Sequence, residues 1–219
     1  MSSCKTIDFL RLGTRTTSFY IKCFKELFEI ENTENTEPEL NLIDVDFSEV
    51  NNFLPNKFDS LKPVLRPYFE TINSEIIVVP NITLHETLDQ LAIPNLIHPV
   101  RETIRELQAS KHSDIFLLGS KYSMQAPYIS TLMHFSGIHV QVPSLADQDK
   151  IDNLRQKIYT GRETNDDIQF YKNYIKTHSL KHPVVVACTE LSIPLDSRNK
   201  AIYDMARIQI SAAFRKAKA

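Results

Sequence analysis

Six short apolar segments recur along the 219-residue chain, and the stretches between them are long enough to form helices. Several of these stretches, including residues 98–111, 147–161 and 199–219, place apolar residues at helical intervals. Strands that alternate with helices predict a parallel sheet with crossover helices, so the chain is expected to be an α/β protein. The apolar segments are TIDFLRL, LNLIDVDF, EIIVVP, DIFLLG, GIHVQVP and PVVVAC.

Two sequence motifs occur twice at nearly the same separation. Gly13 in LGTRTTSFY and Gly119 in LGSKYSMQAPY each follow an apolar segment and precede hydroxyl residues, and they are 106 residues apart. Asn81 in IIVVPNITLH and Cys188 in VVVACTEL are 107 residues apart. Because two unrelated motif pairs share almost one offset, the chain is expected to contain two similar α/β lobes related by a pseudo-two-fold axis.

All four motifs follow predicted strands, at the carboxyl ends where parallel sheets bind ligands. An active-site cleft is therefore expected between the lobes, with Asn81 and Cys188 on opposite walls. The first lobe is assigned to residues 1–98 with 201–219, and the second to residues 99–200.

Composition narrows the class of partner. The net charge is −2 and Lys and Arg form no block, which argues against binding to nucleic acid or an anionic membrane surface. The N-terminal segment resembles no secretory signal and no apolar run is long enough to span a membrane, so a cytoplasmic protein is expected. The three cysteines suit neither a disulfide framework nor a zinc site, and no metal site is expected.

Taken together, the quoted segments resemble the aspartate/glutamate racemase family over nearly the whole chain. The most specific part is Ala-Cys-Thr-Glu-Leu after a valine run, which closely follows the family's Gly-Cys-Thr-Glu-Leu motif. The resemblance implies proton transfer without a cofactor at the α-carbon of a small acidic amino acid or dicarboxylate. It also implies a homodimer.

The chain departs from this pattern at one catalytic position. Such racemases place a cysteine on each face of the substrate, because inversion needs an acid/base on both faces. The family pattern at the first position is Cys-Asn-Thr-x-His, and counting back from His85 puts Asn81 where the cysteine belongs, followed by Ile82 and Thr83. A one-residue slip would put Pro80 there. Neither register supplies a thiol, and an asparagine amide has no usable acid/base equilibrium.

The resemblance therefore gives catalytic positions to Cys188, Thr83 and Asn81, with Cys188 as the remaining acid/base. A helix N-terminus after Cys188 would lower its pKa and make it the most reactive cysteine. Either Arg15 or Arg162 would bind the distal carboxylate of the substrate. The substrate-binding candidates are Thr14, Arg15, Thr17, Ser120, Ser123, Arg162, Thr189, Glu190 and His85.

Two functions remain open from the sequence. The first is a racemase-like isomerase in which Cys188 works and the opposite face is impaired. The second is a degenerate relative that binds a small dicarboxylate or a protein partner, or a one-base decarboxylase or lyase. Retention of Cys-Thr-Glu favours chemistry, whereas loss of the first Cys and Asn favours degeneration.

Overall fold

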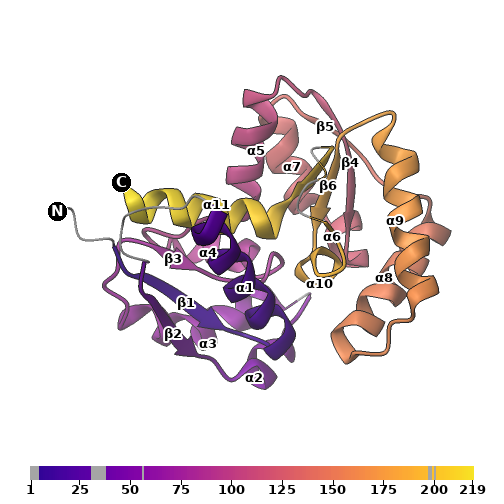
Figure 1. The fold of residues 1–219 in the computed structure, drawn as a ribbon. Coiled ribbons are helices and arrows are strands. Elements are labelled where there is room, and N and C mark those ends of the chain that lie inside the picture. The colour runs from indigo at the N-terminus through magenta and orange to yellow at the C-terminus, as the bar shows by residue number, and fades with distance from the viewer. Residues whose placement is uncertain (1–4, 31–37, 56, 197–198, 200) are drawn as a thin grey trace. The chain divides into compact units, whose positions relative to one another are not determined.

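The computed structural model divides the chain into two compact units, each with its own parallel sheet (Figure 1). Unit 1 comprises residues 1–98 and 209–219, and unit 2 comprises residues 99–208. The structure describes residues 5–30, 38–55, 57–196, 199 and 201–219.

Unit 1 is built on a three-stranded parallel sheet in the order β2-β1-β3. The central strand β1 is buried along four of its five residues, as expected for a strand covered on both faces, whereas the edge strand β2 is mostly exposed or half-buried. The elements of unit 1 are β1 (Ile7–Arg11), α1 (Thr14–Ile30), β2 (Leu40–Asp44), α2 (Phe47–Asn51), α3 (Phe58–Glu70), β3 (Ile77–Val78), α4 (His85–Leu91) and the C-terminal part of α11 (Met205–Lys218).

Unit 2 contains a four-stranded parallel sheet in the order β5-β4-β6-β7. Figure 1 shows α5 and α7 on one side of this sheet and α8 and α9 on the other. Its elements are α5 (Pro99–Ala109), β4 (Asp114–Gly119), α6 (Lys121–Gln125), α7 (Pro127–Phe135), β5 (His139–Gln141), α8 (Leu145–Thr160), α9 (Asn165–Ser179), β6 (Val184–Ala187), α10 (Thr189–Ser192) and β7 (Ile202–Asp204).

The two units repeat one arrangement of strands. In each sheet the first strand of the unit is central, the second pairs with one side of it and the third pairs with the other. Asp114 at the start of β4 follows Ile7 at the start of β1 by 107 residues, and Val184 of β6 follows Ile77 of β3 by the same distance. The prediction of two similar α/β lobes with parallel sheets is confirmed.

The C-terminal segment differs from the prediction. Residues 199–219 were expected to be helical and residues 201–219 to belong to the first lobe. Instead, Ile202–Asp204 forms β7, which pairs in register with Val184–Val186 of β6, and residues up to Ile208 lie in unit 2. The physical reason is that the valine-rich β6 is buried along its length and gains a second hydrogen-bonded neighbour from this short strand.

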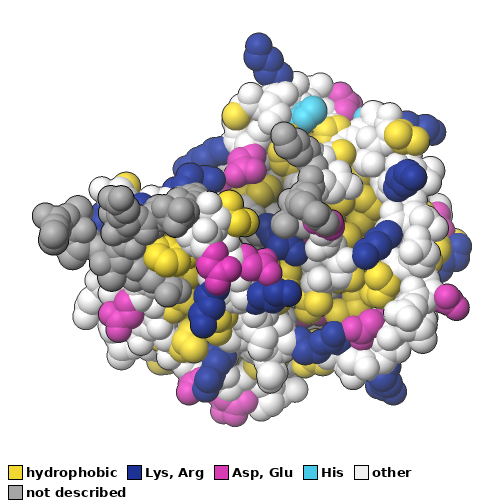
Figure 2. All heavy atoms as spheres, in the orientation of Figure 1, with side chains coloured by type: hydrophobic (Ala, Val, Ile, Leu, Met, Phe, Trp, Pro, Cys, Tyr) yellow, Lys and Arg dark blue, Asp and Glu magenta, His cyan; other side chains and the backbone are white. Residues whose placement is uncertain are grey.

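On the face drawn in Figure 2, Lys and Arg side chains are interspersed with Asp and Glu side chains within each unit. No helix of the described part of the chain is long and apolar enough to cross a membrane.

Candidate functional site

Cys188 lies directly after β6, at the carboxyl end of the unit 2 sheet. The four residues of β6 are fully buried, and Cys188 keeps an extended backbone before α10 begins at Thr189. Only 6% of Cys188 is exposed. Its thiol donates a hydrogen bond to Glu190, with Sγ 3.1 Å from Oε2. The Thr189 hydroxyl donates to the same carboxylate oxygen at 3.2 Å.

The environment of Cys188 favours the neutral thiol. Burial is the main cause that raises its pKa well above the ordinary value, and the negative charge of Glu190 adds to this effect. The Leu191 backbone N–H and the Arg155 charge act in the opposite direction. The sequence-based expectation of a lowered pKa is therefore wrong. The helix α10 has only four residues, so its N-terminus supplies too little positive potential to outweigh burial and a neighbouring carboxylate.

A buried polar network holds the backbone of Cys188. The Ser192 hydroxyl lies 3.1 Å from the Cys188 carbonyl oxygen and 2.7 Å from Asp204 Oδ1, so its one hydrogen can be donated to either oxygen. Asp204 Oδ1 also accepts hydrogen bonds from the backbone N–H groups of Ala206 and Arg207 at the start of α11. Sequence reasoning missed Ser192 and Asp204, although an aspartate immediately before a helical pattern is a recognised helix-start signal.

The end of β4 lies beside the end of β6. Gly119 pairs with Ala187, and a Cβ at Gly119 would come within 2.9 Å of Ser123 Cβ and 3.0 Å of the Ala187 carbonyl oxygen. Ser120 caps α6, because its Oγ accepts a hydrogen bond from the Ser123 N–H, and the two hydroxyls are 2.9 Å apart. The two motifs of unit 2 therefore meet at one edge of the sheet, where Ser120 caps α6 and Ser123 is the residue that this cap binds.

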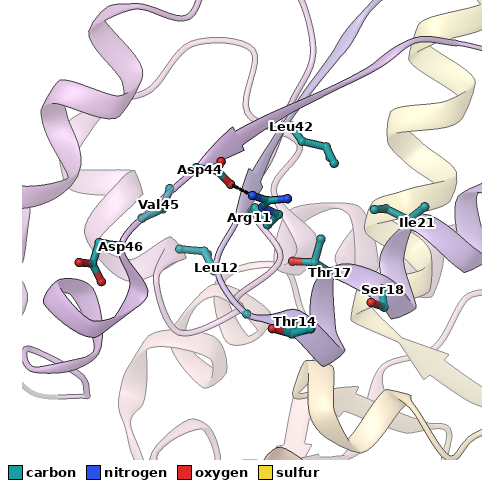
Figure 3. A pocket seen from close by; sticks show the side chains of 11 residues that line it. Arg11, Leu12, Thr14, Thr17, Ser18, Ile21, Leu42, Asp44, Val45 and Asp46 are labelled. Atoms are coloured by element: carbon teal, nitrogen blue, oxygen red, sulfur yellow. Dashed lines mark ion pairs between the residues drawn. The ribbon is translucent and has the colours of Figure 1, made fainter.

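The first motif of unit 1 lines a pocket at the carboxyl ends of β1 and β2 (Figure 3). The pocket has a volume of about 670 Å³ and is crossed by an ion pair between Arg11 and Asp44. Thr17 lines the pocket and is only 4% exposed, and its hydroxyl has no hydrogen-bond partner within the described residues. Thr14 also lines the pocket, whereas Arg15 does not.

Asn81 lies in the segment after β3, where its side chain acts as a local cap. Its Oδ1 accepts a hydrogen bond from the Leu84 N–H at 3.2 Å, and its carbonyl oxygen lies 2.9 Å from Nδ1 of His85. Asn81 and Thr83 are half-buried, whereas Ile82 between them is only 3% exposed.

His85 supports this segment from inside the core. The side chain is fully buried, and burial with the nearby His98 ring lowers its pKa well below the ordinary value. Nδ1–H therefore donates to Asn81, which leaves Nε2 as an acceptor 3.5 Å from the Gln209 amide nitrogen. Gln209 also donates to the Ile97 carbonyl oxygen at 2.7 Å. In this structure the His85 ring has no exposed surface and braces the segment, and a role for His85 in binding substrate stays a prediction.

The two arginines expected to bind a carboxylate differ in exposure. Arg15 is half-buried in α1, whereas Arg162 is exposed beyond the end of α8, where its Nε donates to the Thr160 hydroxyl at 3.1 Å.

A third arginine, Arg155, was missed by sequence reasoning, although its charge interacts with both Cys188 and Glu190. Its only sequence signal is an i,i+3 pairing with Asp152, which is common on solvated helix faces.

In unit 2, Cys188, Thr189 and Glu190 follow β6, and Ser120 and Ser123 follow the paired strand β4. In unit 1, Thr14 and Thr17 line one pocket, and Asn81 and Thr83 lie together after β3. Asn81 and Cys188 belong to different units, and their facing one another stays a prediction.

Comparison with known proteins supports the fold. No protein-family model matches the sequence, and no curated protein matches it. Solved structures do match. An aspartate racemase homologue from Pyrococcus horikoshii OT3 matches with a TM-score of 0.81 at 18% identity, covering 98% of this chain and 100% of that one.

Two further structures agree. A proposed Asp/Glu racemase from Yersinia pestis gives a TM-score of 0.81 at 20% identity, covering 98% of this chain and 100% of that one. The Picrophilus torridus aspartate racemase gives 0.74 at 15% identity, covering 97% of this chain and 94% of that one. The chain therefore has the α/β fold of solved aspartate and Asp/Glu racemase structures, which is the fold that its sequence motifs predicted.

Proposed function

We propose that the protein is an aspartate/glutamate racemase-like isomerase that acts at the α-carbon of a small acidic amino acid, with Cys188 as its acid/base. The observation that carries the proposal is the hydrogen bond from the Cys188 thiol to Glu190 at the carboxyl end of β6. A thiol beside a carboxylate acceptor, in this fold, is suited to moving one proton without a cofactor.

The proton has a defined route in this arrangement. Because burial raises the pKa of Cys188, the resting site holds a neutral thiol that donates its hydrogen bond to Glu190 Oε2. Transfer of the thiol proton to Glu190 Oε2 breaks the S–H bond, forms an O–H bond and leaves the electron pair on sulfur. The thiolate can then take the α-proton of the substrate, and reversal of both steps returns a proton to the same face. The first transfer leaves the net charge of the Cys188–Glu190 pair unchanged. When the thiolate takes the α-proton, the pair loses one negative charge, which the substrate carbanion then carries.

We expect the opposite face of the substrate to lack a strong acid/base. Asn81 occupies the position of the first cysteine in the family pattern, and an asparagine amide has no usable acid/base equilibrium. Thr83 carries a hydroxyl, which is a far poorer acid than a thiol. We therefore expect exchange of the α-proton with retention of configuration, and little inversion.

Substrate contacts are proposed for the hydroxyl groups at the strand ends. The buried hydroxyl of Thr17 has no hydrogen-bond partner among the described residues and lies at the pocket of Figure 3, where a carboxylate oxygen would accept a hydrogen bond from it. Thr14, Ser120, Ser123 and Thr189 are the other candidates, with Arg15 as the cation of unit 1.

The test is proton NMR of the purified protein with L- and D-aspartate and L- and D-glutamate in D₂O. Loss of the α-proton signal of one enantiomer, slowly and without appearance of the other, is the expected result. Cys188→Ala should abolish it, whereas Cys23→Ala, which removes the buried thiol of α1, should leave the rate within about twofold. Absence of exchange with all four substrates would favour a binding protein, and exchange that survives Cys188→Ala would reject Cys188 as the acid/base.

A further inference from the structure

Arg155 is placed by α8 at the edge of the Cys188 site. This helix packs against α10 and α6. Ile151, Leu154 and Ile158 on its buried face share one hydrophobic cluster with Cys188. Arg155 follows Leu154 directly, and only 26% of its side chain is exposed.

The guanidinium of Arg155 is held in a fixed orientation. Its Nε donates to Asp152 Oδ1 at 2.7 Å and its Nη2 to Asp152 Oδ2 at 3.4 Å, a two-point contact. Asp152 is itself anchored, because it accepts hydrogen bonds from the Lys121 backbone N–H at 3.0 Å and from Gln156 at 2.9 Å. Within the described residues these contacts of Arg155 use Nε and Nη2 and leave the N–H groups of Nη1 available.

The fixed orientation of Arg155 matters because the other described charged group that acts on Cys188 is negative. The titratable groups that act on or near the thiol are Glu190 from α10, Arg155 from α8 and Tyr171 from α9. Tyr171 is buried and its phenol stays neutral, since burial raises its pKa. The Cys188 thiol donates a hydrogen bond to Glu190, so this pair brings negative charge into a site where Cys188 is largely removed from water. Among the described groups acting on Cys188, Arg155 carries the positive charge that opposes it.

We propose that Arg155 is a positioning residue whose fixed charge, held by Asp152, offsets the negative charge shared by Cys188 and Glu190 and so allows the buried thiolate to form. This inference rests on the proposed function for the use of the thiolate, but the ionisation itself can be measured without any substrate. When the thiolate forms, the proton moves from Cys188 Sγ to Glu190 Oε2 and the electron pair of the S–H bond stays on sulfur.

The experiment measures the rate constant for alkylation of Cys188 by iodoacetamide as a function of pH, with the labelled site identified by mass spectrometry. Arg155→Met removes the charge and should lower this rate constant about tenfold at neutral pH, equivalent to one unit in the pKa of the thiol. The rise in rate should also move to higher pH. Arg155→Lys keeps the charge and should recover most of the rate.

A matched control is available on α5. Arg105 forms the same kind of i,i+3 pair with Glu102 on an exposed face, so Arg105→Met should alkylate like the wild type. The double variant Asp152→Asn/Arg155→Met removes the partner charge as well, which excludes an effect of an unpaired carboxylate. Circular dichroism checks that each variant is folded.

The outcomes separate this inference from the proposed function. A slower, shifted profile for Arg155→Met and for the double variant, with rescue by lysine, supports the role of Arg155 even if the wild type exchanges no α-proton. An unchanged profile overturns it even if α-proton exchange is found. It is equally overturned if lysine is as slow as methionine, or if wild-type Cys188 is not alkylated at any pH that preserves the fold.

Discussion

Substitution of Gly119 by alanine tests whether the close approach of β4 and β6 builds the Cys188 site. The added Cβ would meet Ser123 Cβ at 2.9 Å and the Ala187 carbonyl oxygen at 3.0 Å. The second contact is with backbone in a buried, hydrogen-bonded strand pair, so a side-chain rotation cannot relieve it. Overpacking of this kind costs about 1–3 kcal/mol.

The equivalent glycine of unit 1 is a built-in control. A Cβ at Gly13 would have no atom within 4 Å, and no left-handed φ is found there. Gly13→Ala should therefore be neutral or stabilise the fold by up to about 1 kcal/mol, through the lower entropy of the unfolded chain.

The assay is urea unfolding followed by circular dichroism, with amide hydrogen exchange to locate the change. With an m-value of about 2 kcal/mol/M, Gly119→Ala should lower the midpoint by about 0.5–1.5 M. Faster exchange should be confined to Val184–Ala187 and Asp114–Gly119, not Ile7–Arg11. Equal midpoints for the two alanine variants would refute the argument that Gly119 is required by this strand contact.

Two further predictions concern buried polar side chains. The Tyr171 hydroxyl is buried without a hydrogen-bond partner among the described residues, so Tyr171→Phe should leave the free energy of unfolding unchanged or raise it. Tyr20→Phe loses a 2.9 Å hydrogen bond to Gln209 and should lower the free energy of unfolding by about 1 kcal/mol. Urea midpoints that rank the two variants the other way would contradict this prediction. Burial lowers the pKa of His85, so its neutral form stabilises the fold above the unfolded-state pKa of about 6.5, and this contribution is lost as pH falls from there toward the lower folded-state pKa. Urea midpoints at neutral and mildly acidic pH should therefore converge in His85→Gln, and an acid sensitivity equal to that of the wild type would show that other groups cause it.

The sequence predicted the strands that are buried on both faces. Short runs of valine, isoleucine and leucine predicted the strands that the structure shows as β1, β4 and β6, and the 107-residue offset predicted the repeat. It did not predict β7, because the three residues Ile202–Asp204 are too few to show a two-residue period and become a strand only through pairing with β6.

The candidate site was predicted in part for a similar reason. Cys188 and Glu190 are neighbours in the sequence, so their motif is visible there. Arg155 and Gln209 lie on helices and resemble ordinary polar positions of a solvated face. Only the packing of those helices brings Arg155 to the Cys188 site and Gln209 to the core beside His85.

Burial of Ile82 decides how a thiol should be introduced at the position where the family pattern has a cysteine. The family pattern would call for both Asn81→Cys and Ile82→Asn, but Ile82 is 3% exposed, and an amide placed there would be buried at a cost of about 1–3 kcal/mol if unpaired. Asn81→Cys alone avoids that cost, although it removes the hydrogen bond that the Leu84 N–H donates to Asn81 Oδ1, worth about 1 kcal/mol. The single variant should therefore stay folded and gain inversion of aspartate or glutamate, measured by chiral chromatography, while the double variant should unfold at lower urea. Asn81→Ser, which keeps a small polar side chain without the thiol, is the matched control and should give no inversion. If Asn81→Cys exchanges the α-proton as fast as the wild type and still inverts nothing, residue 81 does not serve the second face of the substrate.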